Sequence, residues 1–582
     1  MIILGLNAYH GDSSACILKD GILLAAVEEE RFLRIKHWAG IPTKSIKYCL
    51  EEAGISLKDV DYIAINRDPK ANLAKKVKFS LLKRPSISLI TDRLKNSKKV
   101  NNLHETLEKE FGEFNAKIMN IEHHLAHLAS SFFVSKYEKA AVVSVDGFGD
   151  FVGAMWGIGN KNKIEVKNRV YFPHSLGLLY LAITQLLGFP KYGDEFKVMG
   201  LAAYGEPTYY EKMKKMVSWS GYDFKLNLEY FNHHKKLNMT WENGEPITSQ
   251  VFSKNMEQLL IKKRVSTEEI SQDHMNIAAS LQKLYETILL EMLNKIHEES
   301  NSDNLCFAGG CAMNSLANGK ILDNTPFKNI YIQPAAGDAG GAIGAAYYVY
   351  NQIFDKKREY ILKNPYLGPE FTDNQIKTLL KDTKPKNCRI KYYEDQNSLY
   401  YDTAKEISKG HVIGWFQGRM EWGPRALGNR SILGDPRRKD MKEILNLKIK
   451  RRESFRPFAP SILSEEVGKY FEQTYPDPFM LKVYKVKEEK RERIPAVVHK
   501  DGTGRLQTVS YEINPRYHSL ISKFYEITGI PILLNTSFNE NEPVVCTPKE
   551  ALNCFLRTNM DVIILNNFMI KRDPNRNISK TS

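Results

Sequence analysis

The sequence predicts an α/β protein of two domains, the first of which contains a duplicated unit. Three observations support this fold class. The chain has 582 residues, which is more than one hydrophobic core usually fills. Hydrophobic residues make up 42% and charged residues 26%, a composition that is typical of globular proteins and excludes a disordered or fibrous chain. Finally, the order strand, strand, strand, helix, strand occurs twice in the first part of the chain.

The first copy of this unit lies at the N-terminus. We expect a strand at Ile2–Asn7 and two more at Ser14–Leu18 and Ile22–Glu28, which flank a Lys-Asp-Gly turn that favours a hairpin. A helix is expected to begin at Pro42, because apolar residues follow it at helical spacing until a glycine. The apolar segment Val60–Asn66 then predicts a buried strand.

The second copy repeats the same order and is interrupted by helical insertions. Its apolar segments and small-residue stretches predict strands, a helix, two further strands and a final helix, at Ala140–Asp146, Phe151–Ile158, Ile164–Phe172, Ser175–Leu187, Leu305–Phe307, Ile330–Ile332 and Gly340–Tyr350.

A linker is expected near residues 351–365, where charged residues are followed by prolines. The predicted domains are therefore residues 1–355 and 356–582. The second domain is also expected to be α/β, with strand candidates at Val412–Phe416, Leu481–Val486, Thr508–Tyr511 and Ile532–Leu534.

The chain is basic, with 83 Lys and Arg against 68 Asp and Glu, a formal net charge of +15. The excess is concentrated in residues 70–99 and 437–456. This charge favours an anionic partner, but by itself leaves a nucleic acid, a membrane surface and a phosphorylated substrate open.

The seven cysteines form no CxxC motif, so we expect reduced thiols rather than a disulfide framework or a zinc site. No uninterrupted apolar run reaches membrane-spanning length, and the N-terminus lacks the basic segment of a signal peptide. These features predict a cytoplasmic protein with no membrane partner.

Three glycine-rich turns follow predicted strands, at residues 7–14, 146–150 and 308–314. The sequence contains no Walker A motif and no GxGxxG after a strand, so a nucleotide would have to bind in another way. Glycine lets backbone N–H groups approach phosphate oxygens closely. Each turn alone could be an ordinary loop, but ligands of α/β sheets gather at such strand ends.

The segment Glu-His-His-Leu-Ala-His contains the strongest short motif. On a helix, His123 and His127 are four residues apart and share one face, where they can bind one metal ion. The alternative is a pair of surface or capping histidines. Asp146 ends the next predicted strand and Asp338 follows a later one, so the four residues form a candidate set for Fe(II), Mn(II) or Zn(II).

His10 lies in the first glycine-rich turn. A neutral imidazole at this position could accept the proton of an acceptor hydroxyl. A hydrogen-bonded turn residue is the alternative.

The second domain combines arginines with glycines and prolines in segments 418–431, 450–460, 504–507 and 535–539. Arginines on such stiff, close-approach backbone can make bidentate contacts with a small planar anion. A solvated helix face is the alternative, but two prolines interrupt the FRPFAP stretch, which therefore cannot be one.

Taken together, these motifs resemble the O-carbamoyltransferases of nodulation-factor and antibiotic biosynthesis. The resemblance covers nearly the whole chain and rests on GLNAYHGDSSA, EEERF, HHLAH, DGFGD, EFKVMGLAAYG, GGCAMN, GDAGGAIGAA, GRMEWGPRALGNRSIL, ESFRPFAPSIL and LLNTSFN. It implies an N-terminal domain of the actin-like ATPase (ASKHA) fold and a C-terminal YrdC-like domain.

The resemblance also implies an activity. Carbamoyl phosphate and ATP, as its Mg(II) complex, would give carbamoyl adenylate and pyrophosphate in the C-terminal domain. In the N-terminal domain, a hydroxyl of a small-molecule acceptor would then take the carbamoyl group, and AMP would leave.

Site residues follow from the matching motifs. His123, His127, Asp146 and Asp338 match the family's metal positions, where iron(II) is usual, and His10 is a candidate base. The nucleotide candidates are Gly309, Gly310, Asn314 and Gly340. The carbamoyl phosphate candidates are Arg425, Lys450, Arg456, Arg505 and Ser537.

Three other functions would each account for part of the sequence. A threonylcarbamoyl-adenylate and tRNA-modifying enzyme would use the same two folds, but the GPRALGNRS and FRPFAP motifs favour the biosynthetic family. A sugar kinase leaves the second domain unexplained. A nucleic-acid-binding protein would use the basic segment 70–99 but leaves the ordered motifs unexplained, so we expect no nucleic acid partner. A homodimer is expected from the frequency of such assemblies among soluble enzymes.

Overall fold

The computed structural model describes residues 1–582 except 84–99, 101, 237–238, 452, 454 and 574–582. The chain divides into two compact units, Met1–Leu362 and Lys363–Ser582. Both units combine helices with β-sheets, so the α/β class expected from the sequence is confirmed. Among the helices of the described ranges, none combines the length and the hydropathy needed to cross a bilayer.

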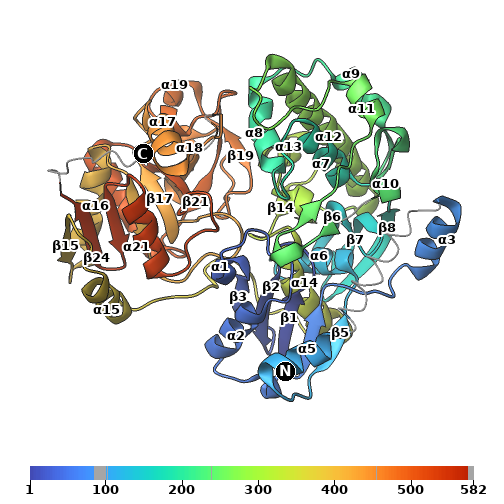
Figure 1. The fold of residues 1–582 in the computed structure, drawn as a ribbon, viewed down its shortest axis with the longest axis horizontal. Helices are drawn as coiled ribbons and strands as arrows, with labels where there is room; N and C mark the ends of the chain where they lie inside the picture. The colour runs from blue at the N-terminus through green and yellow to red at the C-terminus, as the bar shows by residue number, and fades with distance from the viewer. Residues whose placement is uncertain (84–99, 101, 237–238, 452, 454, 574–582) are drawn as a thin grey trace. The chain divides into compact units, whose positions relative to one another are not determined.

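The first sheet of unit 1 has the order β3-β2-β1-β4-β5 (Figure 1). β1 pairs antiparallel with β2 and parallel with β4. Its strands are β1 (Ile2–Asn7), β2 (Ser14–Lys19), β3 (Ile22–Glu28), β4 (Tyr62–Ile65) and β5 (Lys117–Asn120), and helix α2 (Thr43–Glu52) connects β3 to β4. Apolar residues on β1 and β2 are almost completely buried, which fixes the register of this hairpin.

The second sheet repeats this topology, with the order β8-β7-β6-β13-β14. β6 pairs antiparallel with β7 and parallel with β13, as β1 does with β2 and β4. Its strands are β6 (Lys139–Gly149), β7 (Val152–Asn160), β8 (Lys163–Tyr171), β13 (Asn304–Ala308) and β14 (Asn329–Tyr331), and α7 (Leu176–Leu186) follows β8. The two copies therefore share strand order and strand direction, as the duplicated pattern predicts.

Two helices pack between these sheets, α6 (His123–Phe132) after β5 and α14 (Gly341–Tyr347) after β14 (Figure 1). Their contact is close because α14 consists mainly of small residues. A Cβ atom on Gly344 would lie 1.8 Å from the carbonyl oxygen of Ala126, and one on Gly5 of β1 would lie 2.2 Å from that of Ala342. This close packing fixes α6, which carries two candidate ligands.

Insertions extend both copies. Between α7 and β13 the chain forms α8 (Glu195–Leu201), α11 (Lys254–Leu259) and the 29-residue α12 (Gln272–Ser300). Between β4 and β5 it forms α3 (Leu73–Lys83) and α5 (Leu103–Phe111). In Figure 1, α3 lies at the margin of unit 1. Part of the basic segment 70–99, residues 84–99, lies outside the described residues.

Unit 2 is built on an eight-stranded sheet of order β15-β24-β23-β16-β17-β22-β18-β21, beside a two-stranded sheet of β19 and β20. Its strands are β15 (Cys388–Tyr392), β16 (Ile413–Phe416), β17 (Arg430–Gly434), β18 (Ala459–Leu463), β19 (Val483–Lys485), β20 (Thr503–Arg505), β21 (Gln507–Val509), β22 (Ile532–Ser537), β23 (Val562–Leu565) and β24 (Phe568–Arg572). The helices α16 (Gln396–Ser408), α20 (Pro515–Thr528) and α21 (Pro548–Arg557) contribute to its hydrophobic core.

Candidate metal centre and anion site

Helix α6 brings the imidazoles of His123 and His127 together in the interior of unit 1. The two residues lie one turn apart, and their Nε2 atoms are 3.0 Å from each other. His124, between them, faces away and contacts Ser144 Oγ and the Val152 carbonyl oxygen, each at 2.9 Å. His123 and His127 therefore share one face of α6, as their spacing predicts.

Two carboxylates face the imidazoles from different strand ends. Asp146 Oδ2, on β6, lies 3.3 Å from His123 Nε2 and 3.8 Å from His127 Nε2. Asp338 comes after β14 in the chain, and its Oδ1 lies 3.5 Å from both Nε2 atoms. One ligand atom of each of the four buried residues lies within 4.8 Å of all the others.

The donor set fits a divalent transition metal. Two ligands of one ion, at bonds of about 2.1 Å, lie roughly 3.0–3.5 Å apart, which covers most of the distances above. Asp338 Oδ1 is buried and, within the described ranges, accepts no well-formed hydrogen bond. Imidazole and carboxylate donors in combination suit Fe(II), Mn(II) or Zn(II).

The electrostatics of the set also favour a cation. Burial alone would lower the pKa of His127, but Asp146 and Asp338 raise it to about 9. Burial alone would raise the pKa of Asp146, but His123 and His127 hold it well below its ordinary value. Buried carboxylates that remain ionised need positive charge beside them, which a divalent ion can supply.

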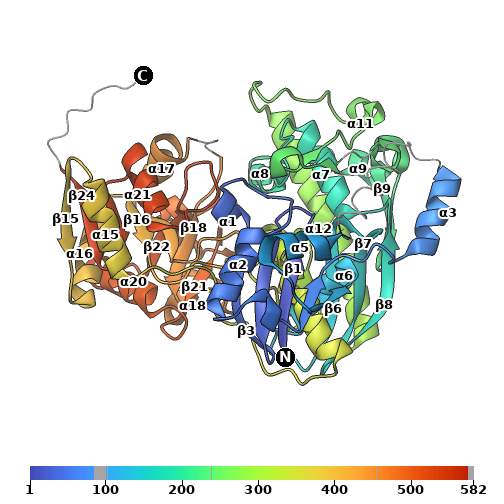
Figure 2. The ribbon, with the colours of Figure 1, turned by 60° about the horizontal axis from the view of Figure 1, so that its bottom comes forward.

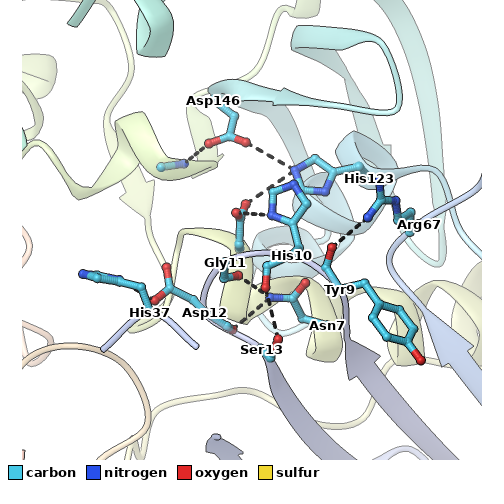
Figure 3. A network of polar contacts seen from close by, with 12 residues as sticks. Asn7, Tyr9, His10, Gly11, Asp12, Ser13, His37, Arg67, His123 and Asp146 are labelled. Atoms are coloured by element: carbon cyan, nitrogen blue, oxygen red, sulfur yellow. Dashed lines mark hydrogen bonds and ion pairs between the residues drawn. The ribbon is translucent and has the colours of Figure 1, made fainter. Parts of the chain in front are cut away.

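His10 shares Asp338 with this set. Its Nδ1 lies 2.6 Å from Asp338 Oδ2, and its ring centroid lies 5.1 Å from that of His123 (Figure 3). Burial alone would lower the pKa of His10, but the charge of Asp338 raises it above its ordinary value. Because Nδ1 contacts the carboxylate, a proton from an acceptor hydroxyl would be taken at Nε2.

The first glycine-rich turn holds His10 in place. Asn7 Nδ2 donates to the carbonyl oxygens of Gly11 and Asp12, both at 2.9 Å, and Ser13 Oγ donates to that of His10 at 3.1 Å (Figure 3). The turn residue is thus both hydrogen-bonded locally and directed at the metal set.

Asp150 is a residue whose role the sequence did not reveal. Its Oδ2 accepts the backbone N–H of His123 at 2.9 Å and that of Asp68 at 2.8 Å. It therefore connects the first turn of α6 to the segment that follows β4. Asp150 has φ 47° in the turn between β6 and β7, so the second aspartate of DGFGD was the available signal.

The nucleotide candidates occupy two turns. Gly309, with φ 90°, approaches β6 so closely that a Cβ atom would lie 2.2 Å from the carbonyl oxygen of Val145. The N–H of Gly310 donates to Asp146 Oδ1 at 2.8 Å, so this turn borders the metal set. Asn314 caps helix α13 (Ser315–Asn324) and hydrogen-bonds Gln282.

Gly340 packs closely against the side chain of Gln333. A Cβ atom there would lie 1.8 Å from Gln333 Nε2, and its N–H donates to the carbonyl oxygen of Gly337 at 3.1 Å. Close packing accounts for this glycine without a ligand.

In unit 2, the structure brings Lys450 and Ser537 together. Lys450 is buried, and its Nζ donates to Ser537 Oγ at 3.3 Å and to Asn539 Oδ1 at 2.6 Å. The sequence analysis did not identify Asn539 as a neighbour of Lys450 and Ser537.

The loop that carries Arg425 is hydrogen-bonded to β21 and to β22, the strand that ends at Ser537. Asn535, on β22, donates to the Ala426 carbonyl oxygen at 3.1 Å, and Gln507 donates to that of Leu427 at 2.7 Å. Burial lowers the pKa of Arg425 to about 10, partly offset by the charge of Asp477. Arg425 and Ser537 thus belong to neighbouring segments.

The remaining candidate cations, Arg456 and Arg505, have other neighbours than Lys450 and Arg425. Arg456 lies 3.4 Å from Glu453, and Arg505 is on β20, which pairs with β19. The structure also places a cation that the sequence did not reveal, Lys482, 3.4 Å from buried Asp477.

Both units match regions that are known in other proteins. Residues 2–347 match the description "carbamoyltransferase N-terminus", and residues 404–572 match "carbamoyltransferase C-terminus".

Individual proteins are also similar in sequence to this chain. The "Uncharacterized protein sll1178" of Synechocystis sp. is 42% identical over 609 residues, covering 98% of this chain and 96% of that protein. "Nodulation protein NolNO" of Sinorhizobium fredii is 38% identical over 580 residues, covering 97% of this chain and 80% of that protein. "3'-hydroxymethylcephem-O-carbamoyltransferase" of Streptomyces clavuligerus is 34% identical over 274 residues, covering 47% of this chain and 49% of that protein.

Proposed function

This chain belongs to the carbamoyltransferase family, and from that premise we propose that it is an ATP-dependent O-carbamoyltransferase. Carbamoyl phosphate and ATP form carbamoyl adenylate, and a hydroxyl of a small-molecule acceptor then takes the carbamoyl group and releases AMP. The acceptor is a sugar, an antibiotic or another secondary metabolite.

The observation that carries this proposal is the buried set of His123, His127, Asp146 and Asp338 beside His10. Such a set suits a reaction in which phosphate charge develops on a leaving group. We assign adenylate binding and carbamoyl transfer to the first domain, residues 1–355, with the glycine-rich turn at Gly309 and Gly310 as the nucleotide contact. The two sheets of identical topology support the actin-like fold for this domain.

We assign adenylate formation to the second domain, residues 356–582, with the YrdC-like fold. Carbamoyl phosphate is a small dianion, so several fixed cations are needed to compensate for the loss of its hydration. The proposed cations are Arg425, Lys450, Arg456 and Arg505, with Ser537 as a further donor. The contact between Lys450 and Ser537, and the fastening of the Arg425 loop to β22, support this assignment.

The atom balance makes the proposal specific. Hydrolysis of carbamoyl phosphate consumes one water and gives carbamate and phosphate. A carbamate oxygen then attacks the α-phosphorus of ATP and displaces pyrophosphate, which gives carbamoyl adenylate. Transfer to the hydroxyl releases AMP. One carbamoylation therefore yields one AMP, one pyrophosphate and one phosphate.

We propose Fe(II) at the His/Asp set and Mg(II) with ATP. His123, His127, Asp146 and Asp338 would hold the metal ion, which would supply Lewis acidity. His10 is the proposed base: Asp338 orients its ring through Nδ1, and Nε2 accepts the hydroxyl proton.

The test is mass spectrometry of an acceptor library incubated with the enzyme, ATP and carbamoyl phosphate. We expect one acceptor class to gain a single carbamoyl group. A reaction that instead requires threonine and modifies tRNA would replace this proposal with the threonylcarbamoyl function of the same fold pair.

A further inference from the structure

Helix α3 presents a row of apolar side chains to solvent. Leu73, Val77 and Leu81 are spaced four residues apart, so they share one face of the helix. They are 58%, 52% and 73% exposed, respectively. Neighbouring Leu82 is 69% exposed. An exposed apolar row of this kind usually marks an interaction surface.

The opposite face of α3 attaches the helix to unit 1. The ring of Phe79 packs edge-on against Phe151 and Phe172, with centroid separations of 5.5 Å and 5.3 Å. Lys75 Nζ lies 4.8 Å from the ring centroid of Tyr171. These contacts hold the helix with its apolar row turned away from them, at the edge of the unit that Figure 2 shows.

Lysines border the apolar row. Lys76 and Lys78 adjoin Val77 in sequence, and on a helix they therefore lie on either side of the row. Lys76 Nζ donates to the carbonyl oxygen of Pro69 at 3.0 Å, and Lys78 is exposed. The sequence from 69 to 83 contains five lysines and neither aspartate nor glutamate.

We propose that α3 docks this protein on an anionic lipid surface, with Leu73, Val77 and Leu81 at the boundary between headgroups and acyl chains. An apolar row flanked by lysines is the pattern of helices that lie in this boundary, because the lysine stems reach outward to the lipid phosphates. The proposal revises the sequence-based expectation that no membrane is a partner. It is independent of carbamoyl transfer, which can be measured without vesicles.

The lysines and the apolar row together favour an anionic lipid surface over two other partners, a second copy of α3 and a nucleic acid. A second copy of α3 would bring lysines against lysines, which repel. A nucleic acid would use the lysines but leave the apolar row in water. Anionic lipid matches both features of the helix.

The test is co-sedimentation of the full-length protein with vesicles of phosphatidylcholine and phosphatidylglycerol in equal parts, and with vesicles of phosphatidylcholine alone. We expect binding to the anionic vesicles that weakens as NaCl is raised, because lysine–phosphate attraction is screened. Leu73→Gln with Leu81→Gln should weaken binding about tenfold or more, because two apolar side chains leave the lipid. Lys78→Gln should weaken binding by up to about fivefold at low salt, because one lysine near the lipid surface is lost.

Ile247→Gln is the matched control, since Ile247 is 54% exposed and lies outside α3. It should leave vesicle binding unchanged. Absence of binding to anionic vesicles would overturn the proposal, as would equal binding by the Leu73/Leu81 variant. A change of oligomeric state in that variant, without vesicle binding by the native chain, would assign the row to self-association instead.

Discussion

Replacing His127 with alanine tests the metal set most directly. Its Nε2 lies 3.0 Å from His123 Nε2 and 3.5 Å from Asp338 Oδ1, so the substitution removes one of four donors. Four-donor zinc sites bind with roughly 10–16 kcal/mol, so an equal share per donor is about 2.5–4 kcal/mol. The metal affinity should therefore fall by roughly 10²–10³-fold.

The measurement is metal content after dialysis against a graded chelator, followed by elemental analysis. We expect His127→Ala to lose the metal and carbamoyl transfer, while pyrophosphate release partly survives because it is assigned to the other domain. His124→Gln is the matched control on the same helix, since His124 contacts Ser144 and Val152 rather than the set. Native metal content in His127→Ala would remove His127 from the ligands and refute this reasoning.

Three further predictions concern the anion site and two charged clusters. Arg456→Ala should raise the KM for carbamoyl phosphate about tenfold or more, through loss of a charge-assisted contact, with little change for ATP; unchanged kinetics would exclude this residue. His37 Nδ1 lies 2.7 Å from Asp12, and although burial alone would lower the pKa of His37, Asp12 and Glu30 raise it to about 9. The protonated form is stabilised on folding, so His37→Gln should lower Tm below pH 6.5, and this difference should vanish as pH rises through about 9; a constant difference would contradict the assignment. Burial alone would raise the pKa of Glu406, but Lys409, Lys571 and His411 lower it to about 2, so the Tm deficit of Glu406→Gln should be full above pH 4.5 and shrink as pH falls toward 2. A deficit that grows with acidity would show that these contacts do not stabilise the fold.

The duplicated sheets of unit 1 were predictable because their strands are apolar and their turns carry clear signals. Ile22–Glu28 is the same in the prediction and in the structure, and the helix after Pro42 begins at Thr43. In unit 2 several strands were missed. β15 (Cys388–Tyr392) is an example: Cys388, Ile390 and Tyr392 alternate with Arg389 and Lys391, a period of two that is typical of a strand and that the prediction did not use.

The metal set could be proposed from sequence because helical spacing and strand-end carboxylates are local signals. Contacts between distant residues could not. Lys450 and Asn539 are separated by 89 positions, and only folding of β22 brings them together. Asp150 depends on a left-handed turn and two backbone N–H groups, which no spacing rule reveals.

Helix α3 illustrates a different limit. Net charge marked residues 70–99 as basic, but charge alone left several partners open. The structure separates the face of Phe79, which packs on Phe151 and Phe172, from the exposed face of Leu73, Val77 and Leu81. The basic segment therefore carries a defined apolar surface.

The central claim is tested most directly by identifying the phosphorus products of ATP by ³¹P NMR. In the presence of carbamoyl phosphate, metal and a hydroxyl acceptor, we expect ATP to give AMP and pyrophosphate, with one phosphate per AMP. Without carbamoyl phosphate, ATP should persist. Formation of ADP, or AMP release that does not depend on carbamoyl phosphate, would contradict the proposed carbamoyl adenylate route.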